Sequence, residues 1–324
     1  MSIQGLLRAL ASGLLFCLPA VAQQEQADPP PSVPASTSPV IDAKPDPHAA
    51  AKLDLTPDAK GALSEQQMQE LFRVVAGKDE ENDKRLRDYT YIERDVENQL
   101  DGKGNKKSTE TKTFEVMELY GEQVQRLIEK DDKPLSEKDK DKEEEKIQKI
   151  VDKRKNEPEE ARKKREEKEE KDREDGRKFV REIADAYNFK LVGTELVGGR
   201  ETWVIDGEPR PGYEPHMKDA KFLPKFHGRV WIDQEDLQLA KMDVEAIETI
   251  SFGWVLARIH KGARVVLEQT RVNDEVWLPR HVTFKLDARV ALLKGYKMDG
   301  EQTYRDYRKF RASAKIVGLS EAKP

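Results

Sequence analysis

Residues 276–288 read VWLPRHVTFKLDA, and the second half of this stretch decides the fold class. Its apolar residues Val282, Phe284 and Leu286 alternate with polar or charged ones. Successive side chains of a β-strand point to opposite faces, so strict alternation predicts a strand with one buried face. The chain is therefore expected to build a sheet with one apolar face and one solvent face.

Similar runs recur along the chain, and short turns separate them. Residues 101–105 read DGKGN, and these residue types tolerate the positive φ angles of a hairpin turn. The expected strands, about nine or ten, span residues 89–100, 107–118, 123–129, 189–197, 201–208, 227–233, 239–250, 263–272, 276–288 and 302–311. Long strands joined by tight turns, without crossover helices, predict an antiparallel and strongly curved sheet in a mainly β (α+β) fold.

An amphipathic helix is expected ahead of the first strand. Ser64 and Gln67 have the spacing of a capping box, in which each side chain bonds the backbone N–H of the other residue. Four apolar residues then fall on one helical face: Met68, Leu71, Phe72 and Val75. The pattern fades between residues 77 and 87, so the helix is expected to fade there too.

A highly charged insert interrupts the strand pattern at residues 136–187. Between residues 129 and 178, 39 of the 50 residues are charged, 19 basic and 20 acidic. Glu precedes Lys by four residues at several places, for example Glu159 and Lys163, and this order stabilises a helix. The insert is therefore expected to be helical, with a kink at Pro158.

Two interpretations of the insert remain open. Its middle, residues 152–177, has almost no apolar residues and is typical of a helix that stands in water. Its far end carries Phe179 and Ile183, which form a candidate docking surface for a protein partner. The sequence thus predicts either a solvated arm or an arm that binds a partner.

Residues 1–22 are typical of a secretory signal peptide. Arg8 precedes a short apolar run, and residues 20–22, AVA, have the small-x-small pattern that signal peptidase cleaves. We therefore expect residues 1–22 to be cleaved and the protein to be located in the periplasm. The alternative is that residues 1–22 stay attached as an uncleaved anchor. Residues 23–61 contain eight of the 17 prolines and predict a disordered tail. Residues 62–324 are expected to form one domain that includes the charged insert.

Composition and spacing exclude several classes of protein. A net charge of −5 and a pI near 5.8 disfavour nucleic-acid binding, which needs a one-sided basic surface. No apolar run has the length of a transmembrane span. Cys17 is the only cysteine and follows the bulky Phe16 within the signal segment, so we expect neither a lipid anchor nor a disulfide.

No pattern of residues indicates catalysis or metal binding. The five histidines lack the spacing of a helical zinc site, and no serine stands in a G-x-S-x-G elbow. Without a cysteine, the mature chain also has no thiol nucleophile. We therefore expect no enzymatic activity, no metal and no cofactor.

Three short motifs resemble the LolA/LolB-like family of periplasmic outer-membrane lipoprotein carriers and their relatives. Residues 228–245, GRVWIDQEDLQLAKMDVE, are similar to a strand and return hairpin of that family. Residues 276–279, VWLP, follow RVND as in the start of another family strand. Residues 304–310, YRDYRKF, resemble the closing strand of acidobacterial members.

The resemblance covers residues 64–315 apart from the insert, and it implies a fold. In the family, an incomplete β-barrel wraps around helices and leaves an apolar concavity that accepts lipid chains. The resemblance therefore implies a curved antiparallel incomplete β-barrel packed on the N-terminal helix. The long charged insert departs from the carrier itself, and no functional residue of the family is transferred to a position here.

Strand alternation also selects candidate ligand-contact residues. Apolar side chains at period two are expected to share the concave face: Val230, Ile232, Met242, Val244, Val282, Phe284 and Leu286. These residues either line a ligand cavity or pack on the N-terminal helix as core, and both interpretations stay open. Between two strands lie the unusually apolar Phe252, Trp254 and Leu256, which form either a lid over the cavity or a further strand.

Two functions follow from these features. The first is a periplasmic carrier that buries a lipid or a lipoprotein acyl chain in an apolar concavity. The second is an envelope interaction or sensor protein, in which the barrel is a filled scaffold and the charged insert binds a protein partner.

Overall fold

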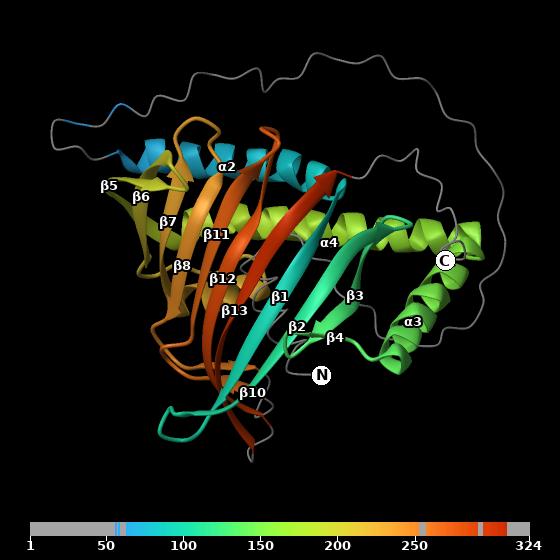
Figure 1. Cartoon of the computed structure of the whole chain (residues 1–324). Helices are drawn as coiled ribbons and strands as arrows, with labels where there is room; N and C mark the ends of the chain where they lie inside the picture. Colours follow the sequence, from blue (N-terminus) through green and yellow to red (C-terminus); the bar gives the residue numbers. More distant parts are fainter. Residues whose placement is uncertain (1–55, 57, 59–62, 253–256, 291–293, 310–324) are drawn as a thin grey trace, which may run out of the picture.

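The computed structural model describes residues 56, 58, 63–252, 257–290 and 294–309 (Figure 1). The expected signal peptide and nearly all of the proline-rich tail lie outside these residues. Of the three lid candidates, Trp254 and Leu256 also lie outside them, and Phe252 is described only as the last residue of a short strand.

One curved antiparallel sheet of 13 strands dominates the fold. Its central path follows the order β4-β3-β2-β1-β13-β12-β11-β8-β7-β6-β5, and β9 and β10 join it through β12. Among the described residues no pairing joins β4 to β5, so the sheet stays open. The strands are β1 Tyr89–Leu100, β2 Lys106–Leu119, β3 Glu122–Lys130, β4 Lys133–Pro134, β5 Tyr187–Val197, β6 Arg200–Pro209, β7 Phe226–Asp233, β8 Leu239–Ala246, β9 Ile250–Phe252, β10 Ala257–Ile259, β11 Arg264–Val272, β12 Val276–Val290 and β13 Lys294–Lys309. The expected fold class is confirmed.

Two of the expected strands have different bounds in the structure. The strand expected over residues 239–250 ends at Ala246, and Ile250 begins the separate strand β9. The last strand begins at Lys294 instead of residue 302. Residues 294–301 read KGYKMDGE, in which two glycines and several charges conceal the alternation, yet Tyr296 and Met298 face the same side as Leu286 and Ala288 of β12.

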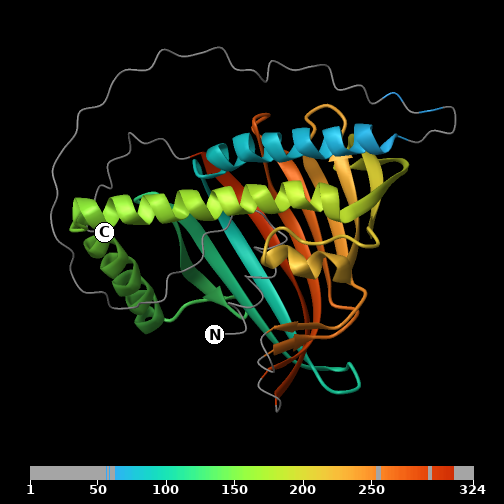
Figure 2. The same cartoon turned by 180° about the vertical axis from the view of Figure 1, so that it is seen from behind.

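Helices α2 (Glu65–Leu86) and α4 (Glu159–Ala186) and the short 3₁₀ helix η1 (Asp219–Lys225) lie on the concave face of the sheet (Figure 2). The expected capping box at Ser64 and Gln67 is confirmed. However, α2 does not fade near residue 77 but continues to Leu86. Tertiary contacts hold its last turns, and the spacing of apolar residues in the sequence does not reveal such contacts. In the described part of the chain, no helix is long and apolar enough to cross a membrane.

The charged insert forms two helices instead of one kinked helix. Helix α3 (Glu137–Lys155) begins at the N-cap Ser136 and packs Ile147 toward β3. Pro158 is the N-cap of α4, because proline cannot donate the hydrogen bond that would continue α3. At the elbow between them, Glu157 accepts hydrogen bonds from Arg154 and Arg165.

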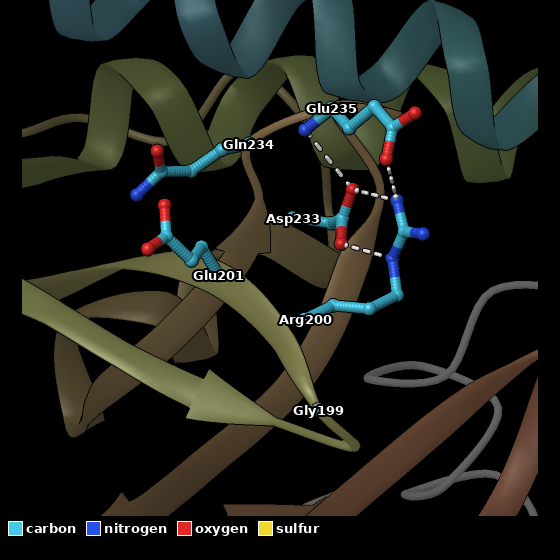
Figure 3. A pocket seen from close by; sticks show the side chains of 6 residues that line it. All are labelled: Gly199, Arg200, Glu201, Asp233, Gln234 and Glu235. Carbon is cyan, nitrogen blue, oxygen red and sulfur yellow. Dashed lines mark hydrogen bonds and ion pairs between the residues drawn. The ribbon is translucent and has the colours of Figure 1, made fainter.

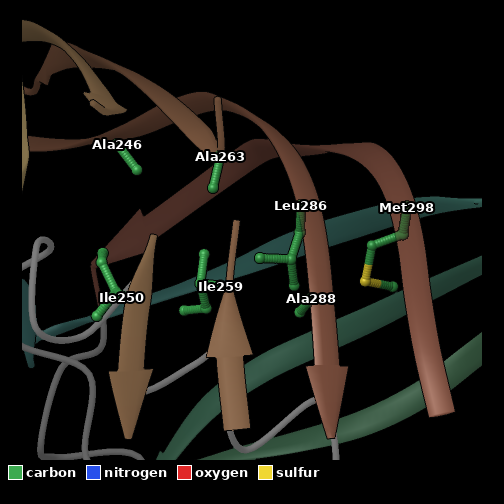
Figure 4. Close-up of a cluster of buried hydrophobic side chains, with 7 residues drawn as sticks. All are labelled: Ala246, Ile250, Ile259, Ala263, Leu286, Ala288 and Met298. Atoms are coloured by element: carbon green, nitrogen blue, oxygen red, sulfur yellow. The ribbon is translucent and has the colours of Figure 1, made fainter. Parts of the chain in front are cut away.

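Three buried clusters follow one another along the concave face. Beneath α2, a cluster joins Met68, Leu71, Phe72 and Val75 to Ile205 and Ile232 of the sheet. A central cluster contains Tyr91, Val116, Met242, Leu267, Val282 and Tyr304. Figure 4 shows the third cluster, where β8 to β13 converge: Ala246, Ile250, Ile259, Ala263, Leu286, Ala288 and Met298. The expected core positions of α2 are confirmed.

Candidate ligand-binding face

Three strands place apolar side chains side by side on the helix-covered face. Val265 of β11 pairs with Val244 of β8 on one side and with Phe284 of β12 on the other. Directly paired residues point to the same face, so the three side chains form one row across the sheet. All three are only partly buried, as is the nearby Val230 of β7. We call Val230, Val244, Val265 and Phe284 the concave-face patch.

The seven ligand-contact candidates divide into two groups. Four of them are buried in the clusters described above: Ile232, Met242, Val282 and Leu286, with exposed fractions of 0%, 7%, 3% and 3%. The other three, Val230, Val244 and Phe284, are partly exposed members of the concave-face patch. The role of all seven in ligand contact stays a prediction.

Val265 is the member of the patch that the sequence did not single out. It stands in the run Val265-Val266-Leu267, where three consecutive apolar residues conceal the alternation. The pairing register resolves the ambiguity, because Val265 and Leu267 pair with the inward-facing Val244 and Met242. Val266 therefore points to the opposite, convex face.

Gly300 of β13 leaves room for the ring of Phe284. The two residues pair directly, and a Cβ atom on Gly300 would stand 2.6 Å from Cζ of Phe284. It would also collide with the carbonyl oxygen of Val96 on β1. The ring thus lies over the glycine and extends the apolar patch toward β1.

Strand β1 presents carboxylates to the same concave face. Tyr91 belongs to the central buried cluster, and residues at period two from it point the same way: Glu93, Asp95 and Glu97. We call these three residues the carboxylate row. Residues 93–97 read ERDVE, a period-two pattern of acidic residues, and this signal could have revealed the row in the sequence.

Side chains of the neighbouring strands contact these carboxylates and change their electrostatic environment. Gln125 Nε2 donates to Glu93 Oε2 at 2.9 Å, and Glu93 is only 4% exposed. Glu97 pairs directly with Gly300 on one side and with Glu110 on the other. Burial, followed by the repulsion of Glu110, raises the pKa of the Glu97 carboxyl. Lys112 forms its ion pair with Glu110, at 2.9 Å.

A polar recess lies at the β5–β6 and β7–β8 turns (Figure 3). It has a volume of about 350 Å³ and is lined by Gly199, Arg200, Glu201, Asp233, Gln234 and Glu235. Two hydrogen bonds join Arg200 to Asp233, at 2.6 and 2.8 Å. Asp233 Oδ1 also accepts the backbone N–H groups of Glu235 and Asp236. Although burial opposes ionisation, these contacts lower the pKa of Asp233, which closes the turn as an anion.

The two tryptophans of the sequence motifs are anchored by hydrogen bonds. Trp231 Nε1 donates to Glu195 Oε2 at 2.8 Å on the convex face, and Lys241 lies over its ring. Trp277 Nε1 donates to Asp236 Oδ2 at 2.9 Å, and Arg200 lies over its ring. These contacts account for both residues as anchors of the strands.

The apolar end of the insert packs inside the chain. Phe179 and Ile183 of α4 contact a buried cluster of Ala186, Tyr187, Ala220 and Leu223. Nearby, the buried Glu182 accepts hydrogen bonds from the hydroxyl of Tyr213 and from the backbone N–H groups of His216 and Met217. The docking surface expected at this end of the insert thus takes part in holding α4 to η1.

Acidic side chains and histidines do not converge on a metal site in the described ranges, where no group of three or more His, Cys, Asp or Glu could hold an ion. Among the residues that the structure describes, each histidine that lies near a carboxylate faces a single one, for example His281 Nε2 beside Glu301 at 3.2 Å.

No known family model matches the chain, and no curated protein matches it. Solved structures do match. A putative outer membrane lipoprotein-sorting protein domain from Vibrio parahaemolyticus is 12% identical, with 78% of this chain and 95% of that chain covered and a TM-score of 0.33. A DUF1329 family protein from Desulfovibrio piger is 11% identical over 78% and 95% of the two chains, with a TM-score of 0.29.

A LolA superfamily protein from Nitrosomonas europaea is 8% identical, with 77% of this chain and 94% of that chain covered and a TM-score of 0.26. The lipoprotein-sorting domain and the LolA superfamily protein carry names of the family that the sequence motifs resemble. The likeness concerns the fold alone.

Proposed function

We propose that this protein binds a hydrophobic ligand, a lipid or a lipoprotein acyl chain, on the concave face of its sheet and acts as a periplasmic carrier. The observation that supports the proposal is the concave-face patch, in which Val244, Val265 and Phe284 stand in register and stay partly exposed. Apolar side chains at the centre of a sheet face normally reach full burial, so a partly open row favours a ligand.

Binding in this proposal is driven by burial and needs no chemical step. Each CH₂ group that leaves water contributes about 0.8 kcal/mol, so a chain of moderate length gains enough to bind reversibly. Release then follows when another acceptor competes for the chain. The described residues supply an apolar surface for this exchange, and the role is one of binding rather than catalysis.

The experiment is a titration of the delipidated, refolded mature protein with a fluorescent fatty-acyl probe. Val265→Asn places an amide in the patch, whereas Val266→Asn places the same amide on the opposite face of the same strand. We expect saturable binding by the wild type, a loss of about tenfold or more in affinity for Val265→Asn and little change for Val266→Asn. Absence of saturable binding by the wild type would refute the carrier proposal.

The second candidate function, an interaction or sensor protein, depends on the α3–α4 insert. Its apolar end packs against η1, so a partner would meet mainly the charged faces of these helices. Exposed ion pairs contribute little affinity each, which makes the insert a weaker candidate site than the concave-face patch. If no acyl probe binds, the α3–α4 insert becomes the better-supported candidate site.

A further inference from the structure

The two edges of the sheet differ in how they are covered. At one edge, side chains of α3 bond the backbone of β3. Glu143 Oε2 accepts the backbone N–H of Leu127 at 3.2 Å, and Lys146 Nζ donates to the carbonyl oxygen of Gln125 at 3.2 Å. At the other edge, β5 pairs with β6 alone among the described residues (Figure 1). Such an open edge presents N–H and C=O groups to a strand of another chain.

Strand β5 also exposes apolar side chains. In the described part of the chain three large apolar side chains are exposed, and two of them, Val192 and Leu196, belong to β5. Their exposed fractions are 49% and 70%. All five residues from Val192 to Leu196 are exposed. A strand that pairs with this edge would remove apolar surface from water as well as satisfy backbone groups.

The pairing with β6 shows to which face each side chain of β5 points. Leu191 pairs with Ile205 of the buried cluster beneath α2, and the register then shifts by one residue at Val192. Beyond this bulge, Thr194 pairs with Trp203, which packs against the same cluster. The concave-facing side chains are therefore Phe189, Leu191, Thr194 and Leu196, and the convex-facing ones include Lys190 and Glu195.

The two charges of β5 are complementary to those of a second copy. Lys190 and Glu195 are the only charged residues of the strand. When two β5 strands pair antiparallel about a two-fold axis between Val192 and Gly193, Lys190 of each chain lies opposite Glu195 of the other, on the same convex face. The bulges of the two strands then lie at one level. Val192 meets Gly193 there, and open space surrounds the Cα of this glycine.

The same register covers the most exposed apolar residue of β5. Leu196 of each chain lies opposite Phe189 of the other, and both point to the concave face. One side of the Phe189 ring already stacks on Phe72 of α2, with ring centroids 4.1 Å apart, and the ring is still only partly buried. The register thus brings opposite charges together on one face and apolar side chains together on the other.

Contacts within the chain leave both charges able to form these pairs. Lys190 attracts Asp206, its neighbour on β6, but makes no ion pair within the described ranges, and Asp206 is bound by Arg229 Nη2 at 2.9 Å. Glu195 is attracted by the same arginine, and its Oε2 accepts a hydrogen bond from Trp231 at 2.8 Å. Its Oε1 has no hydrogen-bond partner in the described part of the chain and can accept the lysine of a second copy.

We infer that the protein forms a two-fold symmetric homodimer in which the β5 strands pair antiparallel and join two sheets into one. The dimer goes beyond the proposed lipid binding and does not depend on it. A single pair of strands buries less area than a standard protein interface, so the dimer is weak and forms with increasing concentration.

Disulfide trapping tests the register, since the chain after residue 22 contains no cysteine. Mature chains with Lys190→Cys are mixed with mature chains with Glu195→Cys and oxidised. Residues opposite one another in an antiparallel pair have Cα atoms about 4.5–5.5 Å apart, which a disulfide can span. We expect a cross-linked dimer from the mixture, identified by mass spectrometry of the linked peptides. Either variant alone should give little, because its two cysteines lie roughly 15 Å apart.

Sedimentation velocity of the full mature chain over a range of concentrations measures the dimer itself. Lys190→Glu places carboxylates opposite one another at both charge pairs and should raise the dissociation constant about tenfold. Lys107→Glu makes the same change of charge at an exposed position of β2, four strands away from the nearer end of the β5 side of the sheet path, and should leave the constant unchanged. Both variants should keep the wild-type circular dichroism spectrum.

Three results would overturn the inference. The first is a wild type that stays monomeric at every concentration, with no cross-link in the mixture. The second is cross-linking of each cysteine variant with itself as efficient as in the mixture, which would require another register. The third is a dimer that appears only after residues 23–55 are deleted, which would show that the N-terminal segment, and not a second copy, occupies the edge of β5.

Discussion

Asn82 and the backbone of Trp277 exchange two hydrogen bonds. Asn82 Nδ2 donates to the Trp277 carbonyl oxygen at 2.7 Å, and the Trp277 backbone N–H donates to Asn82 Oδ1 at 2.6 Å. A side-chain amide thus pairs with β12 in the way that a neighbouring strand would. This contact fixes the end of α2 to the start of the strand that carries Phe284.

Asn82→Ala should destabilise the protein by about 1–3 kcal/mol, because it leaves the backbone groups of the buried Trp277 without their partner. Urea denaturation followed by tryptophan fluorescence measures the change. Gln66→Ala, at an exposed position in the first turn of the same helix, is the control and should change stability little. Equal stability of the two variants would show that the amide pairing contributes nothing.

Much of the sheet could be predicted from the sequence, because alternation and turn residues are local signals. Eight of the expected strands agree with the structure within two residues at each end. The long α2 was underestimated because its last turns are held by Asn82 and Arg85, which bond backbone carbonyls near the start of β12. Such contacts join residues about 190 positions apart and leave no periodic trace in the sequence.

The candidate site was harder to predict, since it depends on register. Periodicity identified Val230, Val244 and Phe284 but could not separate them from the buried Met242 and its neighbours. That difference arises from where α2, α4 and η1 lie over the sheet, which a single strand does not encode. The carboxylate row was missed because acidic residues at period two are usually assigned to a solvent face.

Gly300→Ala should destabilise the sheet, since the new methyl group would collide with the Phe284 ring and the Val96 carbonyl oxygen. Overpacking of this kind costs about 1–3 kcal/mol. Gly295→Ala on the same strand is the matched control, because a Cβ there meets no atom within 4 Å. Thermal unfolding by circular dichroism should give a lower midpoint for Gly300→Ala only. Equal midpoints would contradict the close approach of ring and glycine.

Glu157→Gln should loosen the elbow between α3 and α4. Glu157 accepts hydrogen bonds from Arg154 and Arg165, each at 3.0 Å, and the side chains are only 10%, 13% and 16% exposed. Loss of the charge weakens two charge-assisted hydrogen bonds at once. We expect faster amide hydrogen exchange in residues 150–170 and unchanged exchange in the sheet.

Glu160→Gln, at an exposed position of the same elbow, is the control for that experiment. Its exchange should equal that of the wild type. If Glu157→Gln also exchanges like the wild type, the elbow is held by helix propensity and not by these ion pairs.

Acid should weaken the attachment of α4 through Glu182. Burial opposes ionisation of this carboxyl, but hydrogen bonds from Tyr213 and from the backbone of His216 and Met217 prevail and lower its pKa. A carboxyl whose pKa is lower in the folded state stabilises the protein above its unfolded pKa, about 4.3 for Glu, and loses this contribution as the pH falls through the folded pKa.

Glu182→Gln tests this pH dependence, because an amide keeps the shape of the side chain and does not titrate. At pH 7 the variant should be less stable than the wild type by about 1–3 kcal/mol, since the hydrogen bonds lose their charge. The difference should shrink as the pH falls below about 4, where the wild-type carboxyl takes up a proton. Urea midpoints of both proteins from pH 7 to pH 3 give the comparison, and a difference that stays constant over this range would show that the Glu182 charge does not hold the helix.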